Sequence, residues 1–290
     1  MRFLRLALAS VAALWLIMVT GAAVRLTDSG LGCRHWPGCE KGHPLPAKNY
    51  HAYIEFGNRV LGGVTIAVVL LTAIAARRAP GLGRGGRRLA LAVFLGTLAQ
   101  APLGYLAVKT DLRWPIVAAH LLLSALVLAG AVVLALLAAR GVESLVPIDL
   151  QRVGVVVVCA GLVLLVTGTL ATAAGPHSGG GSAHVDRLWR LQPLVYVHAG
   201  AVAVFGLGLV FVLGYLAGRR DRAQRLLAAG LAVLGLLVVQ MVIGEIQYRT
   251  HLPWPLVLVH VGLAAAVWAA LVAFVTLLWR PLPSLVPGRA

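Results

Sequence analysis

Eight apolar stretches, each long enough to cross a lipid bilayer, dominate this sequence of 290 residues. They are predicted at residues 4–24, 54–76, 89–108, 116–138, 153–174, 193–217, 226–246 and 256–279. Apolar residues make up 60% of the chain, more than a water-soluble protein of this length can bury. Because a segment in lipid must satisfy its backbone polar groups internally, we predict an all-α integral membrane protein with eight transmembrane helices.

The chain contains one sequence pattern twice, at a constant spacing of 140 residues. The repeated pairs are Gln100 and Gln240, Gly104 and Gly244, Thr110 and Thr250, Trp114 and Trp254, Pro115 and Pro255, and His120 and His260. The same spacing aligns Asn58 with His198. An even number of spans per copy means that both copies enter the membrane in the same direction. We therefore predict two parallel-oriented four-helix units, residues 1–140 and 150–280.

The formal net charge of +16 is concentrated at places that set membrane orientation. Arginines cluster in the short connections at 77–88 and 219–225 and near both termini. By the positive-inside rule these segments face the cytoplasm, with both termini inside, so no nucleic-acid partner is predicted. The first apolar stretch follows Arg2 and Arg5 as in a signal peptide. We treat it as a span because its loss would break the repeat.

Three histidines, His120, His198 and His260, lie within predicted spans. His120 comes six residues after Trp114, about 9 Å below the start of its helix at roughly 1.5 Å per residue. His260 has the same position in its own helix, and His198 lies a few residues into its span. The three therefore share a layer in the outer third of the membrane.

An ionisable group inside a span is costly and usually faces the bundle interior with a function. A single such histidine can be a hydrogen-bonded packing residue. Three at one depth, on even-numbered helices that face one another, favour axial ligation of haem iron. Zinc is less favoured, because no compact carboxylate or thiolate set completes its coordination.

Glu55 precedes Asn58 by one helical turn on the same face. It is either an interfacial carboxylate paired with Arg59 or, beside a cofactor layer, a proton carrier or electrostatic stabiliser. Asn58 forms hydrogen bonds but is a poor iron ligand, so His120 is the strong protein ligand of the first unit. Glu245 is predicted to form a structural pair with Arg249.

Cys33 and Cys39 lie in the outer loop at residues 25–52. Five intervening residues, two of which favour turns, allow ring closure, and disulfides persist outside the cytoplasm. We predict a disulfide rather than a metal pair, either structural or able to exchange with a thiol partner. Cys159, inside a span, is predicted to be an inert packing residue.

Three stretches resemble the haem A synthase family. They are Thr20-Gly21 followed by RLTDSGLGCRHWPGC at 25–39, IEFGNR at 54–59 and GPHSG at 175–179. The resemblance, which covers nearly the whole chain, implies an oxidoreductase of the bacterial cell membrane. Such an enzyme oxidises the C8 methyl of haem O to a formyl group, by successive hydroxylation and loss of water, for aa3-type terminal oxidases. The implied partners are haem O delivered by a haem O synthase, an electron donor and oxidase assembly factors.

The same resemblance assigns roles to the candidate residues. His198 and His260 would bind a resident haem b in the second unit. His120 would hold the substrate haem in the first, with Glu55 near its reacting edge. Cys33 and Cys39 would form the outer-loop disulfide of the family.

The chain departs from the family pattern at Asn58, where members carry a histidine. An iron with two axial histidines has no open position for an oxidant, whereas an iron bound by His120 alone has one. We hypothesise that Asn58 lines this open side and forms a hydrogen bond to water or an oxygen species at the iron.

Two other functions use the same sequence features. A quinol-linked dihaem membrane cytochrome needs the three histidines but neither Glu55 nor an entry for a substrate. A secondary transporter can also be built from duplicated units, but the chain lacks evident broken helices around a central polar site.

Overall fold

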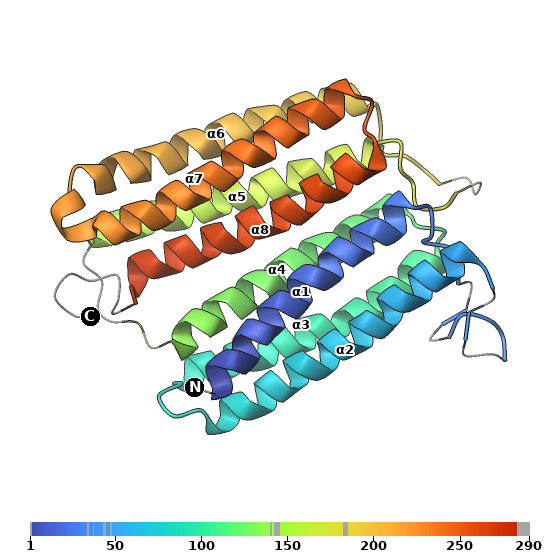
Figure 1. Cartoon of the computed structure of the whole chain (residues 1–290), viewed down its shortest axis with the longest axis horizontal. Coiled ribbons are helices and arrows are strands. Elements are labelled where there is room, and N and C mark those ends of the chain that lie inside the picture. Colours follow the sequence, from blue (N-terminus) through green and yellow to red (C-terminus); the bar gives the residue numbers. More distant parts are fainter. Residues whose placement is uncertain are drawn as a thin grey trace.

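The computed structural model describes residues 2–33, 35–36, 38–42, 45–46, 48–139, 141, 146–181 and 185–282, except for the side chains of 220–222. Figure 1 shows eight long helices. They are α1 (Arg2–Leu26), α2 (Tyr50–Arg78), α3 (Arg84–Lys109), α4 (Trp114–Ala138), α5 (Ile148–Ala174), α6 (Leu191–Ala217), α7 (Arg220–Arg249) and α8 (Trp254–Trp279). Each has the length and hydropathy of a membrane span, which confirms all eight predicted spans.

The helices extend a few residues beyond the apolar stretches that predicted them. Polar and charged residues at a span's end lie outside the hydrocarbon region yet continue the helical hydrogen bonding. Asn49, for example, caps α2 by accepting a hydrogen bond from the His51 amide, so that α2 begins at Tyr50, four residues before the predicted span at 54. At α4 and α8, proline follows the first tryptophan and occupies the first turn, where its missing N–H is not needed.

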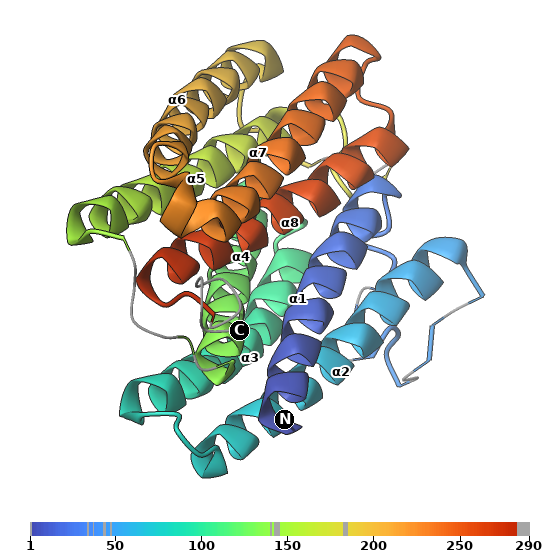
Figure 2. The same ribbon diagram turned by 60° about the vertical axis from the view of Figure 1, so that its left-hand side comes forward.

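Helices α1–α4 form one bundle and α5–α8 a second beside it, as both views show (Figures 1 and 2). In each bundle the helices pack against their neighbours in sequence, and the first also packs against the fourth. Among the described residues, α2 does not contact α4, and α6 does not contact α8. The helices that carry the candidate ligand positions are therefore diagonally opposed in each bundle.

The two bundles meet along α1, α4 and α8, with α5 also against α4. Two tryptophan side chains donate hydrogen bonds across this interface. Trp15 Nε1 donates to the Gly262 carbonyl at 3.0 Å, and Trp268 Nε1 donates to the Ala125 carbonyl at 2.8 Å. Both carbonyls belong to helices of the other bundle, close in sequence to His260 and His120. The apolar ring of each tryptophan packs at the interface while its polar N–H is satisfied.

The start of α1 and the end of α8 lie at one end of the molecule, opposite the long connections that follow α1 and α5 (Figure 1). This arrangement agrees with an even number of spans, while the cytoplasmic position of that end stays a prediction. One sequence prediction is wrong: Cys159 is exposed on the surface of α5 and is not a packing residue. A thiol is apolar enough to lie on a lipid-facing surface, so burial of Cys159 is not required.

Candidate functional site

The second bundle brings His198 of α6 and His260 of α8 towards each other across its diagonal. The two side chains are close enough for their charges to interact. Each ring also lies against the backbone of a neighbouring helix at a glycine. A Cβ on Gly168 would be 2.9 Å from Cε1 of His198, and a Cβ on Gly244 would be 3.0 Å from Cε1 of His260. Glycine is therefore needed at both positions for the rings to pack this closely.

The hydrogen bonds of His198 determine which ring nitrogen is available to bind a metal. Its Nδ1 lies 3.0 Å from the Thr167 hydroxyl, which itself donates to the Leu164 carbonyl at 2.9 Å. A hydroxyl has one proton, so when Thr167 donates to Leu164 it accepts from the N–H at Nδ1 of His198. Nε2 of His198 then carries the free lone pair, which is the form of imidazole that binds iron.

His260 lacks a comparable partner on its ring. Its Nδ1 is buried without a hydrogen bond, among the residues that the structure describes. The backbone carbonyl of His260 accepts a hydrogen bond from Gln240 Nε2 at 2.9 Å. This Nδ1 lies against the backbone of α7 near Gly244, so the nitrogen of His260 that is left to bind a metal is Nε2.

The first bundle presents a different pair, His120 on α4 and Asn58 on α2. Nδ1 of His120 is buried without a hydrogen bond in the described part of the chain, as in His260. Asn58 is engaged elsewhere, since its Oδ1 accepts a hydrogen bond from the Thr20 hydroxyl at 2.8 Å. At the repeated ligand positions, the described residues thus provide one imidazole in the first bundle and two in the second.

These donor sets suit haem better than a bare metal ion. Within the described residues, no three or more His, Cys, Asp and Glu side chains gather as ion ligands. Haem iron needs only one or two axial imidazoles, because the macrocycle supplies the other four nitrogens. His120, His198 and His260 can each supply one imidazole nitrogen of this kind.

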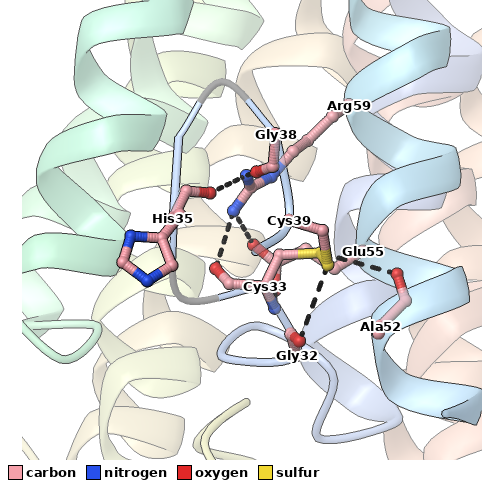
Figure 3. Close-up of polar contacts among 8 residues, drawn as sticks. All are labelled: Gly32, Cys33, His35, Gly38, Cys39, Ala52, Glu55 and Arg59. Carbon is pink, nitrogen blue, oxygen red and sulfur yellow. Dashed lines mark hydrogen bonds and ion pairs between the residues drawn. A yellow bond between two sulfur atoms is a disulfide. The ribbon is translucent and has the colours of Figure 1, made fainter. Parts of the chain in front are cut away.

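The outer end of α2 carries a compact polar network around Glu55, drawn in Figure 3. Glu55 is 5% exposed, and both of its carboxylate oxygens are occupied. Oε2 accepts from the Cys33 amide at 2.7 Å, and Oε1 accepts from Arg59 Nη2 at 2.5 Å. Arg59 Nη2 also donates to the Cys33 carbonyl at 2.9 Å, and Nη1 donates to the carbonyls of His35 and Gly38. The Glu55–Arg59 pair therefore fastens the outer loop to α2.

The predicted cysteine pair and both predicted ion pairs are present. Cys33 and Cys39 form a disulfide, and both cysteines are buried beside Ala52 of α2. Glu55 pairs with Arg59, as one of its two interpretations required. Glu245 pairs with Arg249 at the outer end of α7, and both side chains are exposed. The two pairs share the same spacing, but only the first is buried and linked to a loop.

Hydrogen bonds also join the outer connections of the two bundles. Arg25 at the end of α1 donates to the carbonyls of Thr172 and His177 at 2.8 and 2.9 Å. His177 Nε2 in turn bonds the Leu252 carbonyl at 2.7 Å, and the Gly30 amide donates to the Gly179 carbonyl at 2.8 Å. The stretches 25–39 and 175–179 that were singled out in the sequence are therefore one contact region in space.

A cavity of about 790 Å³ opens among these outer connections. Its lining includes Asp28, His51, Lys109 and Asp111. This polar, mixed-charge lining is unlike the apolar surroundings that a haem macrocycle needs. We call this cavity the outer vestibule, because it lies at the end of the molecule that is predicted to face away from the cytoplasm.

Sequence reasoning did not identify Thr20, Thr167 or Gly168 as site residues. Thr167 and Gly168 contact His198, and Thr20 contacts Asn58. A signal was available, because Val-Thr-Gly occurs at 19–21 and again at 166–168. Its spacing of 147 differs from the main repeat, so a search at a spacing of 140 misses it.

Comparisons with known proteins agree with these features. The family model described as cytochrome oxidase assembly protein, COX15-CtaA, matches residues 4–177, which is more than half of the chain. The chain is 36% identical over 110 residues to the heme A synthase of Geobacillus kaustophilus, a match that covers 37% of this chain and 33% of that protein. It is 34% identical over 131 residues to the heme A synthase of Bacillus pumilus, covering 44% of this chain and 42% of the relative.

A longer match is weaker in identity. The heme A synthase of Shewanella oneidensis is 25% identical over 316 residues, covering 91% of this chain and 93% of that protein. The chain thus spans about a third to two fifths of the Geobacillus and Bacillus relatives and nearly all of the Shewanella one. With the match over residues 4–177, the eight spans and the paired ligand positions taken together, the chain belongs to the cytochrome oxidase assembly protein family COX15-CtaA.

Proposed function

We propose that this protein is a haem A synthase, an oxidoreductase that converts haem O to haem A by oxidising the C8 methyl group to a formyl group. The observation that carries the proposal is the unequal pair of sites: the repeated ligand positions hold two imidazoles, His198 and His260, in one bundle, and one imidazole, His120, opposite Asn58 in the other. A resident electron-transfer haem needs two firm ligands. A haem that must react and leave is better held by one.

In the second bundle, His198 and His260 hold a haem b whose iron, when bound, supplies one-electron transfer. Thr167 keeps His198 in the tautomer that presents Nε2. Gly168 and Gly244 let the two rings lie close against α5 and α7. Farther along the same helices, Phe205, Leu209 and Leu271 belong to the buried apolar core.

In the first bundle, His120 holds the substrate haem O. Asn58 contributes an amide whose Oδ1 is bound to Thr20, which leaves its Nδ2 protons for a hydrogen bond on the open side of the site. Glu55 and Arg59 hold the disulfide loop against α2, one turn from Asn58. With both oxygens bound, Glu55 acts by positioning this loop and by its negative charge.

The setting of the proposed reaction is the bacterial plasma membrane. Haem O from a haem O synthase, an electron donor and oxidase assembly factors are the partners that this function requires. The outer vestibule and the loops around it lie on the side opposite the arginine-rich end, which is predicted to face the cytoplasm.

The decisive experiment is expression of the chain in a host that makes haem O but no haem A, followed by extraction and mass analysis of the haems. Haem A must accumulate in these cells and be absent from cells that carry a His120→Ala variant. Unaltered haem O beside a normal low-spin haem b spectrum would instead identify a membrane cytochrome that transfers electrons only.

A further inference from the structure

The two bundles share a second repeated motif with a spacing of its own. Val19-Thr20-Gly21 of α1 corresponds to Val166-Thr167-Gly168 of α5, 147 positions later. The connection from α1 to α2 (27–49) has 23 residues, and the connection from α5 to α6 (175–190) has 16. The seven extra residues account for the change from a spacing of 147 before the loop to 140 after it. Thr20 and Thr167 are therefore equivalent positions.

Each of these threonines contacts the residue at the equivalent ligand position of the next helix. Thr167 Oγ1 lies 3.0 Å from Nδ1 of His198, and Thr20 Oγ1 lies 2.8 Å from Oδ1 of Asn58. The two threonines differ in their contact with their own helix. Thr167 Oγ1 lies 2.9 Å from the Leu164 carbonyl, and a Thr167 that donates there accepts from Nδ1–H of His198. Thr20 lies farther from the equivalent carbonyl, 3.3 Å from Ile17, and donates to Asn58.

The glycine that follows each threonine differs in its surroundings. Gly168 lies under the His198 ring, where a Cβ would approach Cε1 to 2.9 Å. A Cβ on Gly21 would meet nothing within 4 Å. The first bundle has therefore kept the threonine and the glycine that accommodate an imidazole, although Asn58 is too short to cover the glycine.

We propose that the Thr-Gly pair of α1 and of α5 is a seat that orients the ligand-position residue of the following helix, with Thr167 the positioning residue for His198 and Thr20 for Asn58. In the second bundle the seat fixes Nδ1 as donor and Nε2 as the iron-binding nitrogen. In the first bundle, Thr20 of the seat donates to Oδ1 of Asn58, which leaves Nδ2 of Asn58 as a free donor. This inference rests on the proposed function for its haem groups, but it concerns the hydrogen bonds of this chain.

The seat has a measurable electronic consequence. An acceptor on Nδ1–H makes the imidazole a more basic ligand, which stabilises ferric over ferrous iron. The Thr167 hydroxyl is a strengthened acceptor, because it donates at the same time to Leu164. Removal of the hydroxyl must raise the reduction potential of the resident haem.

The first test compares Thr167→Val, Thr167→Ser and Thr169→Val in the full-length protein purified with its resident haem. Thr169 is a matched control, since it is buried on the same helix and its hydroxyl bonds only its own helix, at Leu165. The readouts are the midpoint potential and the low-spin electron paramagnetic resonance spectrum. Thr167→Val is expected to raise the potential and shift the g values, whereas Thr167→Ser and Thr169→Val keep both at wild-type values. A Thr167→Val protein with wild-type potential and g values would overturn the proposal.

The second test concerns the first bundle and uses the empty place over Gly21. Asn58→His is expected to place a ring there and to convert haem bound at His120 to a low-spin form. Adding Thr20→Val to Asn58→His must weaken this low-spin signal, because the ring loses its Nδ1 acceptor. Equal low-spin signals with and without Thr20 would contradict a shared seat.

These outcomes are separable from failure of the proposed function. The potential measurement needs only the resident haem and no conversion of haem O. If the protein forms haem A but Thr167→Val leaves the midpoint potential of the resident haem unchanged, the role of the Thr-Gly seat is refuted and the synthase function is retained. A shifted potential in a protein that makes no haem A would support the seat and refute the synthase.

Discussion

The backbone amide of Cys33 donates a 2.7 Å hydrogen bond to Oε2 of Glu55, which joins the disulfide loop to α2 across 22 positions of sequence. Arg59 closes the same junction, because one of its nitrogens contacts both Glu55 and the Cys33 carbonyl. Glu55 is therefore a buried carboxylate with two partners. A change at this residue affects the loop as well as the charge near the first site.

Replacement of Glu55 by alanine is expected to abolish haem A formation while leaving the resident haem intact. The loop loses its carboxylate partner, and misplacement by about 1 Å near a reacting group can cost on the order of 100-fold in rate. The low-spin haem b spectrum should be unchanged, because His198 and His260 lie in the other bundle. Haem extraction and absorption spectra measure the two effects.

Glu245→Ala is the matched control for Glu55→Ala. Glu245 has the same i, i+4 arginine partner at 2.5 Å, but both side chains are exposed and no loop depends on them. Haem A yield from this variant should equal the wild-type yield. An equal loss of haem A in both variants would show that removing either carboxylate has the same effect, and would contradict a specific role for Glu55.

The histidines should separate into two classes by absorption spectroscopy. His198→Ala or His260→Ala should remove the low-spin haem b spectrum of the purified protein, because each deletes one of two axial ligands. His120→Ala should keep that spectrum and lose only binding of added haem O. A colourless wild-type protein, or loss of haem b in His120→Ala, would contradict the assignment of the two sites.

Replacement of Gly168 by alanine should displace the His198 ring, since the new Cβ would lie 2.9 Å from Cε1. Overpacking of this kind typically costs about 1–3 kcal/mol, and here the cost falls on an iron ligand. The haem b content after purification should fall. Gly21→Ala, at the equivalent position with nothing within 4 Å, provides the control and should retain wild-type haem b.

Thiol labelling distinguishes the three cysteines of the chain. Cys33 and Cys39 are disulfide-bonded and buried, so a maleimide should modify them only after reduction and denaturation. Cys159 is a free thiol on the lipid-facing surface of α5, so after denaturation it should react without reduction. Mass spectrometry of peptides from the labelled protein counts the modified sites. Labelling of Cys33 before reduction would count against the disulfide.

Much of the fold follows from local sequence. The eight spans were predictable because a 20-residue apolar run in lipid can satisfy its backbone only as a helix. The start of α4 and of α8 followed from Trp-Pro, since proline favours the first helical turn. The equal positions of His120 and His260, six residues after the first residue of α4 and of α8, followed from the repeat, and their depth in the membrane stays a prediction.

The environment of each side chain depended on contacts between distant segments. Glu55 had two interpretations in the sequence, and the position of the loop backbone near its carboxylate is a tertiary fact. Cys159 was expected inside the protein, because an apolar run in lipid does not show which helix face is covered. The contacts of Thr20 with Asn58 and of Thr167 with His198 depend on the packing of α1 against α2 and of α5 against α6.

The sequence alone determined that the chain is an eight-helix membrane protein with a duplicated pattern, three intramembrane histidines and an outer cysteine pair. Only the tertiary structure decided which residues hold the ligand positions in place: Thr167 and Gly168 at His198, Thr20 at Asn58, and Arg59 with the Cys33 backbone at Glu55. The physical reason is that hydropathy and helix periodicity act within one segment, whereas hydrogen-bond partners and close ring contacts arise from helix packing. A shift of seven residues in one loop was enough to hide the second repeat from a search at fixed spacing.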